Sequence, residues 1–499
     1  MKRKIFLILI GYIFCWTCLK AQSWDWAIKT GNSLSDEAHS IGVDKQSNVY
    51  VTGSDYNFSG GGASNGSYYN EWLFKFDPAG QLLWKTQLDI TVTKSVTDST
   101  GNTYITAGNF IEKYDNNGTK LWTVYQPAYF QSIGLHPDQG VFVAGRIIVN
   151  NVSTGILISL DNNGSKVWEK IGDFSSGGSI PFALATDEKN YLYVAGDGDK
   201  DSTTGNLGFL AKYDKAGNLI YIRSIPHTPT SIAIDKQNNI YLFGWFAIMP
   251  ININGIVYSS PQGKRKAYLL KYDSNNQVEW FKFFGGQNGL AGNMVADKNN
   301  KLYLSNLFDS SMTIDSVSLT SVGTDGYVIN FDEDGNLIWI KNSVGAAGAY
   351  GAITTPKTIA LNNMNEVFIA GSLAGNVSFD SFNFSHQSMY QDMFVAKISD
   401  NNITSINDIK ISEIASDANL NIYPNPSRGD FVLNYSSEDK SDLVISIIDN
   451  KGQVIYYEHY ASFGGNLIKN IDLSRKAGGI YNIEILNGKK KIVKRIVLN

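Results

Sequence analysis

A short frame repeats along this chain: an Asp, a tight polar turn, and a strand that carries an aromatic residue seven positions after the Asp. The segment Lys113-Tyr-Asp-Asn-Asn-Gly-Thr-Lys-Leu-Trp122 shows it most clearly. The six copies are Asp77–Trp84, Asp115–Trp122, Asp161–Trp168, Asp214–Tyr221, Asp273–Trp280 and Asp332–Trp339. A unit that recurs at this interval predicts an array of similar β-hairpins.

A second frame places an aromatic residue six positions after an Asp or Asn. Its copies are Asp44–Tyr50, Asp98–Tyr104, Asp187–Tyr193, Asp235–Tyr241, Asp297–Tyr303 and Asn362–Phe368, and a shifted copy at 137–142 makes seven. Successive aromatic residues of this frame are 38 to 65 residues apart, enough for four strands and their loops. The two frames together predict an all-β fold, a seven-bladed β-propeller.

The two ends of the repeat region complement each other. The last repeat ends at Phe394-Val-Ala-Lys-Ile-Ser399 with no Trp strand after it, whereas residues 23–29 carry Trp24 and Trp26 with no first half before them. We therefore expect the N-terminal strand to complete the last blade, with Trp26 beside residues 392–398. Such closure would leave no large exposed sheet edge.

The repeated residues have a structural explanation. In Asp-x-x-Gly the carboxylate can accept hydrogen bonds from turn amides, and Gly can adopt the positive φ that the hairpin requires. The Trp of the following strand can pack between blades. Residues 332–335, Asp-Glu-Asp-Gly, could also suggest a calcium loop, but they lack the longer ligand series and terminal Glu of an EF-hand, so a structural turn is favoured.

Four segments of different composition divide the 499 residues. Residues 1–21 have a basic start, a 14-residue largely apolar run and a small residue at the end, as in a secretory signal peptide. Residues 22–400 hold the propeller, and 401–418 form a polar linker. Residues 419–499 contain seven strand-like segments, which predict a small Ig-like β-sandwich. Both cysteines, Cys15 and Cys18, lie in the signal, so the mature chain would have no disulfide.

Charge argues against nucleic acid as a partner. The whole chain carries −4, the first 21 residues carry +4 and residues 420–499 carry +3, which leaves −11 on residues 22–419. Binding phosphates requires a cationic surface, so an acidic propeller is a poor match for nucleic acid. After removal of the signal no integral membrane segment is expected.

No catalytic, metal-binding or cofactor-binding residues are indicated. The five His residues form no metal-spaced pair, and the chain has no nucleophile elbow. Carboxylates from different blades could still converge in space, which spacing along one chain does not reveal.

Binding residues are expected on the long variable loops. If the strands of a blade alternate in direction, both Asp turns lie on one face and the variable loops share the other. These loops are 54–71, 245–266, 307–325 and 372–391. Their candidate ligand-face aromatic residues are Tyr56, Phe58, Tyr68, Tyr69, Trp245 and Tyr258. Stacking on sugar rings or contact with a protein surface would use such residues.

The two frames resemble the SBBP-type β-propeller repeats of secreted bacterial proteins over residues 24–400. The likeness is strong for the fold and says little about function. The Trp-containing half is also similar to the repeats of pyrroloquinoline-quinone dehydrogenases, but those often carry paired Cys beside the cofactor. The mature chain has no Cys, so no quinone cofactor is expected.

The C-terminal segment resembles the type A sorting domain of type IX secretion cargo in Bacteroidetes. The matching motifs are Tyr423-Pro-Asn-Pro426, Asp449-Asn-Lys-Gly452, Gly479-Ile-Tyr481 and a basic end. The residues that carry this resemblance are Pro424, Pro426, Gly429, Gly452, Gly479, Tyr481 and Lys494. It implies Sec export, translocation to the outer-membrane surface or the medium, and the secretion machinery and a sortase as partners. An ordinary Ig-like accessory module is the alternative.

For the propeller these observations favour a non-catalytic binding or adhesion module for a glycan or a surface protein. The alternative is an enzyme, a polysaccharide lyase or hydrolase, that uses carboxylates from several blades.

Overall fold

The computed structural model describes the chain between Gln22 and Leu498 with several gaps. The described residues are 22–30, 35–57, 68–136, 140–172, 174, 179–201, 205–225, 227–246, 251–253, 256–258, 266–284, 292–315, 317–346, 351–385, 390–399, 420–448, 454–474, 476, 478–487 and 490–498. They fold into two compact units, one within Ala21–Asp400 and one that includes Asn401–Asn499. Every helix or strand assigned in them is a β-strand, as expected for an all-β protein. Within these ranges no helix is long and apolar enough to cross a bilayer.

Five sheets of the larger unit have four antiparallel strands each, as in propeller blades. Their strands are β2 (Asp36–Val43), β3 (Val49–Asn57), β4 (Tyr68–Phe76) and β5 (Leu82–Leu88); β6 (Lys94–Thr97), β7 (Thr103–Ala107), β8 (Phe110–Tyr114) and β9 (Lys120–Tyr125); β10 (Tyr129–His136), β11 (Gly140–Val149), β12 (Val152–Asp161) and β13 (Lys166–Ile171); β14 (Ile180–Thr186), β15 (Leu192–Asp201), β16 (Gly205–Tyr213) and β17 (Leu219–Ile225); β18 (Pro229–Ile234), β19 (Ile240–Phe246), β22 (Lys266–Tyr272) and β23 (Val278–Phe284). A hairpin of β20 (Ile251–Ile253) and β21 (Ile256–Tyr258) is inserted between β19 and β22.

An eight-stranded sheet contains the remaining large strands of this unit. They are β24 (Asn293–Ala296), β25 (Leu302–Ile314), β26 (Val317–Phe331), β27 (Leu337–Asn342), β29 (Ile353–Leu361), β30 (Val367–Ala374), β33 (Asp392–Ser399) and β1 (Ser23–Thr30). A single parallel pair, Thr324 with Ile353, joins β26 to β29. On either side of that pair, four antiparallel strands repeat the pattern of the other sheets.

The N-terminal strand pairs with the last strand of the unit, as the sequence predicts. β1 runs antiparallel to β33, and Trp26 lies opposite Lys397. One buried cluster also joins the first and last sheets, because Ala38 and Phe74 pack with Phe368 and Val395. Residues near the two ends of this unit therefore share a core.

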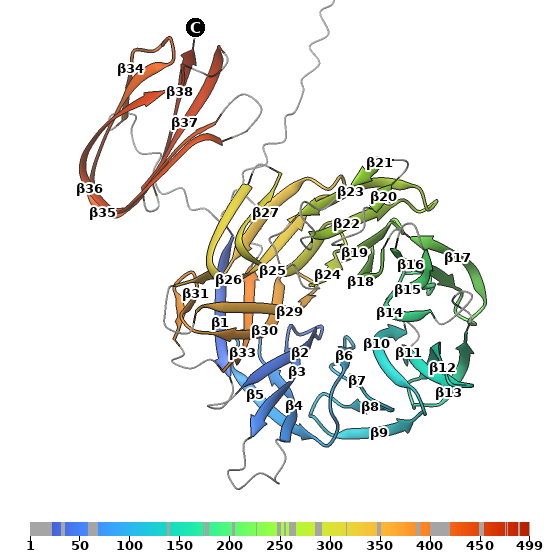
Figure 1. Ribbon diagram of the computed structural model, residues 1–499. Coiled ribbons are helices and arrows are strands. Elements are labelled where there is room, and N and C mark those ends of the chain that lie inside the picture. The colour runs from blue at the N-terminus through green and yellow to red at the C-terminus, as the bar shows by residue number, and fades with distance from the viewer. Residues whose placement is uncertain are drawn as a thin grey trace, which may run out of the picture. The chain divides into compact units, whose positions relative to one another are not determined.

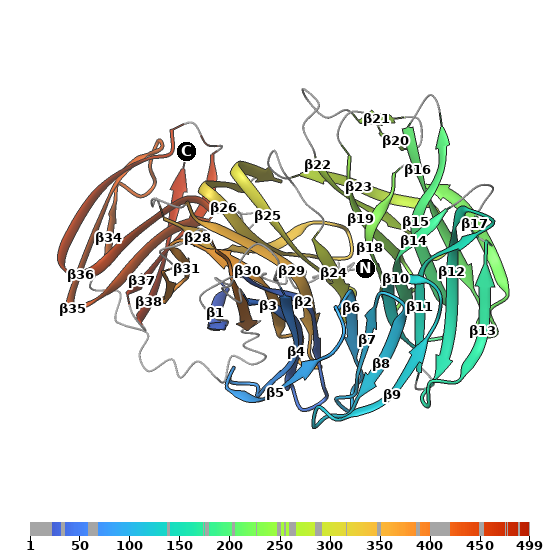
Figure 2. The same cartoon turned by 60° about the horizontal axis from the view of Figure 1, so that its bottom comes forward.

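The sheets stand side by side around a common centre (Figure 1). The strands nearest that centre are β2, β6, β10, β14, β18, β24 and β29. Figure 2 shows the β20–β21 hairpin projecting at the top of the view. Since strands alternate in direction, both Asp turns of a sheet lie at one end of it. We call the opposite end, where the second strand connects to the third and one sheet to the next, the loop face.

The turn between the first and second strands is organised by a buried acid. Asp44 Oδ1 accepts hydrogen bonds from the amides of Gln46 and Asn48, both at 2.9 Å. Its Oδ2 accepts one from the Tyr50 hydroxyl at 3.1 Å. The corresponding pairs Asp187–Tyr193 and Asp235–Tyr241 repeat this bond. In these three copies of the six-position frame, the Asp and the Tyr therefore form one hydrogen-bonded unit.

The turn between the third and fourth strands receives an aromatic residue from the preceding sheet. Trp122 Nε1 donates to the Asn162 carbonyl at 3.0 Å. A Cβ on Gly164, whose φ is +82°, would lie 3.0 Å from that indole. The same contact joins Trp84 to Gly118, Trp168 to Gly217 and Trp280 to Gly335. The expected packing of the Trp between blades is confirmed, and Gly is required both for its φ and for the close approach.

The C-terminal unit has five strands where the sequence predicts seven. They are β34 (Leu420–Tyr423), β35 (Asp430–Ile448), β36 (Val454–Asp472), β37 (Gly479–Asn487) and β38 (Lys490–Leu498). β35 and β36 each contain two of the predicted strands. Their pairing shifts register between Ser437 and Leu443, so the polar segment there forms a bulge instead of a turn and the strands continue. Residues from both halves of β35 share one buried cluster with β37 and β38.

Candidate functional site

Most of the aromatic residues that the sequence assigns to the ligand face lie in or beside strand extensions. Tyr56 ends β3 opposite Tyr69 of β4, and Tyr68 begins β4. Tyr258 pairs with Ile251 in the β20–β21 hairpin. The side chains of these four tyrosines, like all of Phe58, lie outside the described part of the chain.

Trp245 is placed differently from the expectation of an exposed loop residue. It belongs to β19, opposite Ala267 of β22, and its side chain is partly buried and in contact with other groups. The segment read as the start of a loop is thus still part of a sheet, because β19 and β22 remain paired as far as Phe246 and Lys266.

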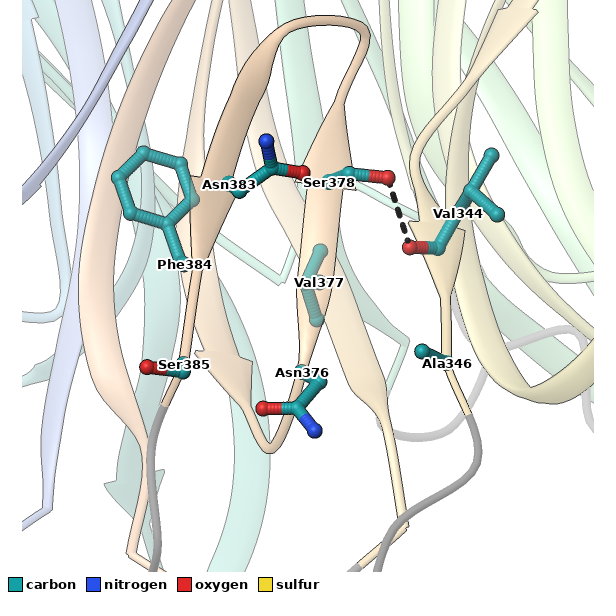
Figure 3. Close-up of a pocket in the computed structure, with 8 residues that line it drawn as sticks. All are labelled: Val344, Ala346, Asn376, Val377, Ser378, Asn383, Phe384 and Ser385. Carbon is teal, nitrogen blue, oxygen red and sulfur yellow. Dashed lines mark hydrogen bonds between the residues drawn. The ribbon is translucent and has the colours of Figure 1, made fainter.

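Residues 376–378 and 383–385, within the variable segment 372–391, line a hollow of about 270 Å³ (Figure 3). Strands β31 (Val377–Phe379) and β32 (Phe382–Phe384) fold back as a hairpin, and β28 (Val344–Gly345) pairs with β31. The lining residues are Val344, Ala346, Asn376, Val377, Ser378, Asn383, Phe384 and Ser385. Ser378 Oγ donates to the Val344 carbonyl at 3.2 Å, the bond drawn in Figure 3.

The chemistry of this hollow is neutral. None of its lining residues is titratable, and its polar groups are the amides of Asn376 and Asn383 and the hydroxyls of Ser378 and Ser385. The lining residue Phe384 packs edge-on to Phe379 with ring centroids 6.0 Å apart. The hollow thus offers amide and hydroxyl groups beside an aromatic ring that is packed on a second ring. We call it the neutral hollow.

A second group of exposed aromatic residues was missed from the sequence. Phe110, Tyr125 and Tyr129 are 39%, 60% and 46% exposed at the loop-face ends of β8, β9 and β10. The sequence pattern points to the long loops, whereas these residues flank two short connections, between β7 and β8 and between β9 and β10. The signal that could have revealed them is Tyr125-Gln-Pro-Ala-Tyr129, two tyrosines on either side of a Pro.

Charged residues converge near the inner strands of the first and last sheets. His39 Nε2 lies 3.2 Å from Glu71 Oε2, and its Nδ1 lies 3.7 Å from Glu37 Oε1. Lys357 forms an ion pair with Glu37. His39 and Lys357 both sit at register shifts of their strands, and a bulge re-aims the side chain it carries. Burial lowers the pKa of nearby Lys94, and the Lys357 ammonium lowers it further.

A smaller hollow of about 120 Å³ lies beside the β1–β33 junction. Its lining residues are Thr30, Asp36, Ser54, Asp55, Phe74, Lys85 and Met393. Asp55 accepts hydrogen bonds from Trp72 Nε1 at 2.9 Å and from the Asn70 amide at 2.8 Å, so its carboxylate is already satisfied by the protein. Among the residues that the structure describes, no three His, Cys, Asp or Glu side chains are grouped to hold a metal ion.

In the C-terminal unit, the motif residues cluster around the ends of strands. Pro424 and Pro426 both follow cis peptide bonds, and Gly429 has a φ of +114°. A Cβ on Gly429 would lie 2.4 Å from the Ser474 backbone, so only Gly fits there. Gly479, with a φ of +156°, begins β37.

Two further motif residues join strands of this unit. Tyr481 is buried opposite Ile496. Lys494 Nζ donates to the Leu420 carbonyl and so connects β38 to β34. Gly452 lies outside the described residues.

This C-terminal unit matches a known family model. Residues 421–499 match the model of the secretion system C-terminal sorting domain. This part of the chain is therefore a sorting domain. Residues 25–54 match the model of a β-propeller repeat, SBBP, so the sorting domain follows a propeller-type region.

The sorting domain places the chain among proteins sorted by type IX secretion. It implies interaction with the type IX machinery and a secreted or cell-surface location. Both agree with the expectations drawn from the C-terminal motifs.

Relatives of the chain are distant. The uncharacterized WD repeat-containing protein L264 of Acanthamoeba polyphaga mimivirus is 23% identical over 253 residues, which are 44% of this chain and only 17% of that protein. Similar solved structures include Sqt1 of Chaetomium thermophilum, with a TM-score of 0.42, 9% identity, and coverage of 76% of this chain and 98% of that one. A protein of unknown function from Bacteroides caccae has a TM-score of 0.35, 12% identity, and coverage of 62% and 94%. At these TM-scores neither carries an argument about function.

Proposed function

We propose that residues 22–400 form a seven-bladed propeller closed into a ring by β1. Five four-stranded sheets and the two halves of the eight-stranded sheet supply seven sets of four strands. The junction between last and first sheets resembles the others, which supports closure. Trp26 Nε1 donates to the Pro78 carbonyl at 3.0 Å, as Trp122 does to the turn of its next sheet.

Hydrogen bonds between the inner strands support the same ring. The backbone amide of Ile41, in the first sheet, donates a hydrogen bond to Thr358 Oγ1, in the last sheet, at 3.3 Å. In the same way, the backbone amide of Ser95, in the second sheet, donates a hydrogen bond to Ser40 Oγ, in the first sheet, at 2.9 Å. A bond that recurs between neighbouring sheets is expected to recur at the closing junction of a ring.

In the proposed protein, residues 1–21 direct Sec export, 401–418 form a linker and 419–499 fold as a type A, Ig-like sorting domain. A sortase then removes this domain or exchanges it for a surface anchor. The single curved sheet of the C-terminal unit, with a buried cluster shared between its halves, is compatible with a sandwich.

The proposed role of the propeller is to bind a glycan at the loop face, without catalysis. The neutral hollow carries this proposal. Sugar hydroxyls both donate and accept hydrogen bonds, which Asn amides and Ser hydroxyls can match, and the apolar face of a sugar can pack on Phe384. The absence of titratable groups from its lining favours an uncharged sugar unit over an ionic ligand.

Replacing Asn376 tests this role. Asn376→Ala removes an exposed amide at the edge of the hollow, so the fold should persist while glycan affinity falls about fivefold, the effect of one hydrogen bond of about 1 kcal/mol. The measurement is a glycan array with the full-length protein, followed by calorimetry on the best ligand. Asn117→Ala, an exposed Asn of an Asp turn, is the matched control. Equal affinity of Asn376→Ala and wild type would remove the hollow from the site.

An enzyme acting on polysaccharide is the second candidate, and the charged cluster around His39 favours it. Two carboxylates flank this imidazole, from Glu37 and Glu71, an arrangement that can serve acid–base chemistry. Incubation with a panel of polysaccharides tests this candidate. Cleavage that Glu71→Gln abolishes would establish it, and binding without cleavage would exclude it for those substrates.

A further inference from the structure

The exposed aromatic residues at the edge of the β6–β9 and β10–β13 sheets form two cross-strand pairs. Phe110 of β8 lies opposite Tyr125 of β9, with ring centroids 5.5 Å apart and planes at 58°. Tyr129 of β10 lies opposite Arg146 of β11, whose guanidinium carbon is 5.4 Å from the tyrosine ring. We call these four residues the aromatic shelf.

Hydrogen bonds fix the backbone that carries the shelf, although its side chains are exposed. The Gln126 amide donates to the Asn109 carbonyl at 2.9 Å, and the Phe130 amide donates to the Gly108 carbonyl at 3.1 Å. These bonds fix the β9–β10 connection against the β7–β8 turn. Ala128 and Phe130, on either side of Tyr129, are buried in a common cluster. A connection whose backbone is already fixed loses little backbone entropy when a ligand binds.

The β7–β8 connection is too short to cover the shelf. Only Gly108 and Asn109 separate the two strands, whereas ten residues separate β3 from β4 in the preceding sheet. The rings of Tyr125 and Tyr129 are therefore exposed to solvent at the loop face. Exposed aromatic clusters of this kind mark binding surfaces more often than isolated apolar residues do.

Arg146 adds a charge that suggests what binds. Residues 22–400 contain three Arg among a net excess of acids. Arg223 is packed on Tyr272, with 3.9 Å from its guanidinium carbon to the ring, and donates to the Asn276 carbonyl. Arg265 lies outside the described residues. Arg146 is exposed, and no carboxylate of the described chain lies within ion-pairing distance of it. Its guanidinium can donate two parallel hydrogen bonds to a carboxylate of a ligand.

We propose that the aromatic shelf binds an acidic polysaccharide, one whose sugar units carry carboxylates. The apolar faces of successive sugars stack on Tyr125 and Tyr129, and Arg146 pairs with a carboxylate. The exposed side-chain amide of Asn109, which precedes Phe110 of the shelf, suits sugar hydroxyls. The positive charge of Arg146 at the shelf itself favours an acidic polymer over a neutral one there.

This inference deepens the proposed glycan binding, because it rests on a glycan being the ligand of the loop face. The shelf and the neutral hollow are built from different sheets and share no residue. Each can therefore be removed without changing the other, so their failures are distinguishable.

Affinity electrophoresis of the full-length protein tests the proposal, with gels that contain polygalacturonate or its methyl ester. The two polymers share a backbone and differ in charge. Wild type should be retarded by polygalacturonate and much less by the ester. Tyr125→Ala should weaken retardation at least tenfold, Arg146→Gln should remove the preference for the acid, and Arg146→Lys should retain part of it.

Phe283→Ala provides the control, since Phe283 is also an exposed aromatic residue, at 46% against 60% for Tyr125, and lies on β23 of another sheet. Thermal melts confirm that each variant is folded. If Tyr125→Ala and Arg146→Gln are retarded as much as wild type, the proposal that the shelf binds an acidic polysaccharide is wrong. It is also wrong if the wild-type protein is retarded in neither gel. If the shelf variants lose retardation while Asn376→Ala binds every glycan as wild type does, the neutral hollow alone is rejected as a binding site. If Asn376→Ala loses glycan affinity while the shelf variants are retarded as wild type is, the aromatic shelf alone is rejected.

Discussion

At the scale of single residues, two aspartates that look alike in the sequence have different surroundings. Asp44 is buried and accepts hydrogen bonds from two amides, the Asn48 side chain and the Tyr50 hydroxyl. Asp77 is more exposed and accepts two amides, from Ala79 and Gln81. The first stabilises the core of a sheet and the second only its outer turn.

We expect Asp44→Ala to cost more stability than Asp77→Ala. Removing Asp44 leaves the Tyr50 hydroxyl without its partner in a buried site, at a cost of about 2 to 3 kcal/mol. Removing Asp77 leaves amides that water can reach, at a cost of about 1 kcal/mol. Urea unfolding of the two variants measures the difference, and equal midpoints would contradict this assignment.

Buried tyrosines predict a loss of stability at high pH. Burial, with the adjacent Asp next in size, raises the pKa of Tyr50, Tyr193 and Tyr241 above the usual tyrosine value. The folded state keeps these protons while the unfolded chain releases them above about pH 10, so stability falls as pH rises through that value and is unaffected below it.

Thermal melts between pH 8 and 11 with tyrosinate absorbance measure this effect. These tyrosinates should appear together with unfolding, and Tyr50→Phe should reduce the pH dependence. Ionisation of all tyrosines in a protein that stays folded would contradict the expectation.

At the scale of elements, each fourth strand connects one sheet to the next. Trp84, Trp122, Trp168 and Trp280 all pack on a Gly of the neighbouring turn. Trp26 does the same on Gly80, although it comes from the opposite end of the unit. β1 therefore acts as an ordinary fourth strand.

Trp26→Ala should destabilise the propeller about as much as Trp122→Ala. Both substitutions empty a contact with a Gly turn and remove an indole hydrogen bond, at a cost of about 3 kcal/mol each. Melting temperatures of the two variants provide the comparison. If Trp26→Ala leaves the melting temperature unchanged while Trp122→Ala lowers it, β1 does not contribute to the stability of the unit.

At the scale of the whole molecule, the two units have separate hydrophobic cores. The cluster around Leu433 and Ile483 contains only residues of the C-terminal unit. Removal of residues 420–499 should therefore leave the propeller folded.

The truncated protein should remain in the periplasm, because the sorting domain directs the last step of export. Cell fractionation measures its location, and protease resistance checks that it is folded. Surface display at the wild-type level would contradict the role of the domain.

The sequence by itself determined the repeated hairpins, the pairing of β1 with β33 and the sorting domain. Each depends on residue types at a fixed spacing, such as Asp44 with Tyr50 or Trp122 with the Gly of a turn. Such spacing can be recognised in the sequence alone. Loop lengths and strand register do not follow from local spacing. The sequence pattern places Trp245 in a loop, although β19 continues through it, and a polar segment that predicts a turn forms a bulge within β35.

Only the tertiary structure decided where binding groups gather. The neutral hollow joins Val344 to Ser378 across more than thirty residues, and the aromatic shelf brings Tyr129 to Arg146 across a hairpin. Short connections, not long ones, left the shelf exposed. Exposure depends on what neighbouring loops fail to cover, a property of the assembled sheets that no local pattern of residues specifies.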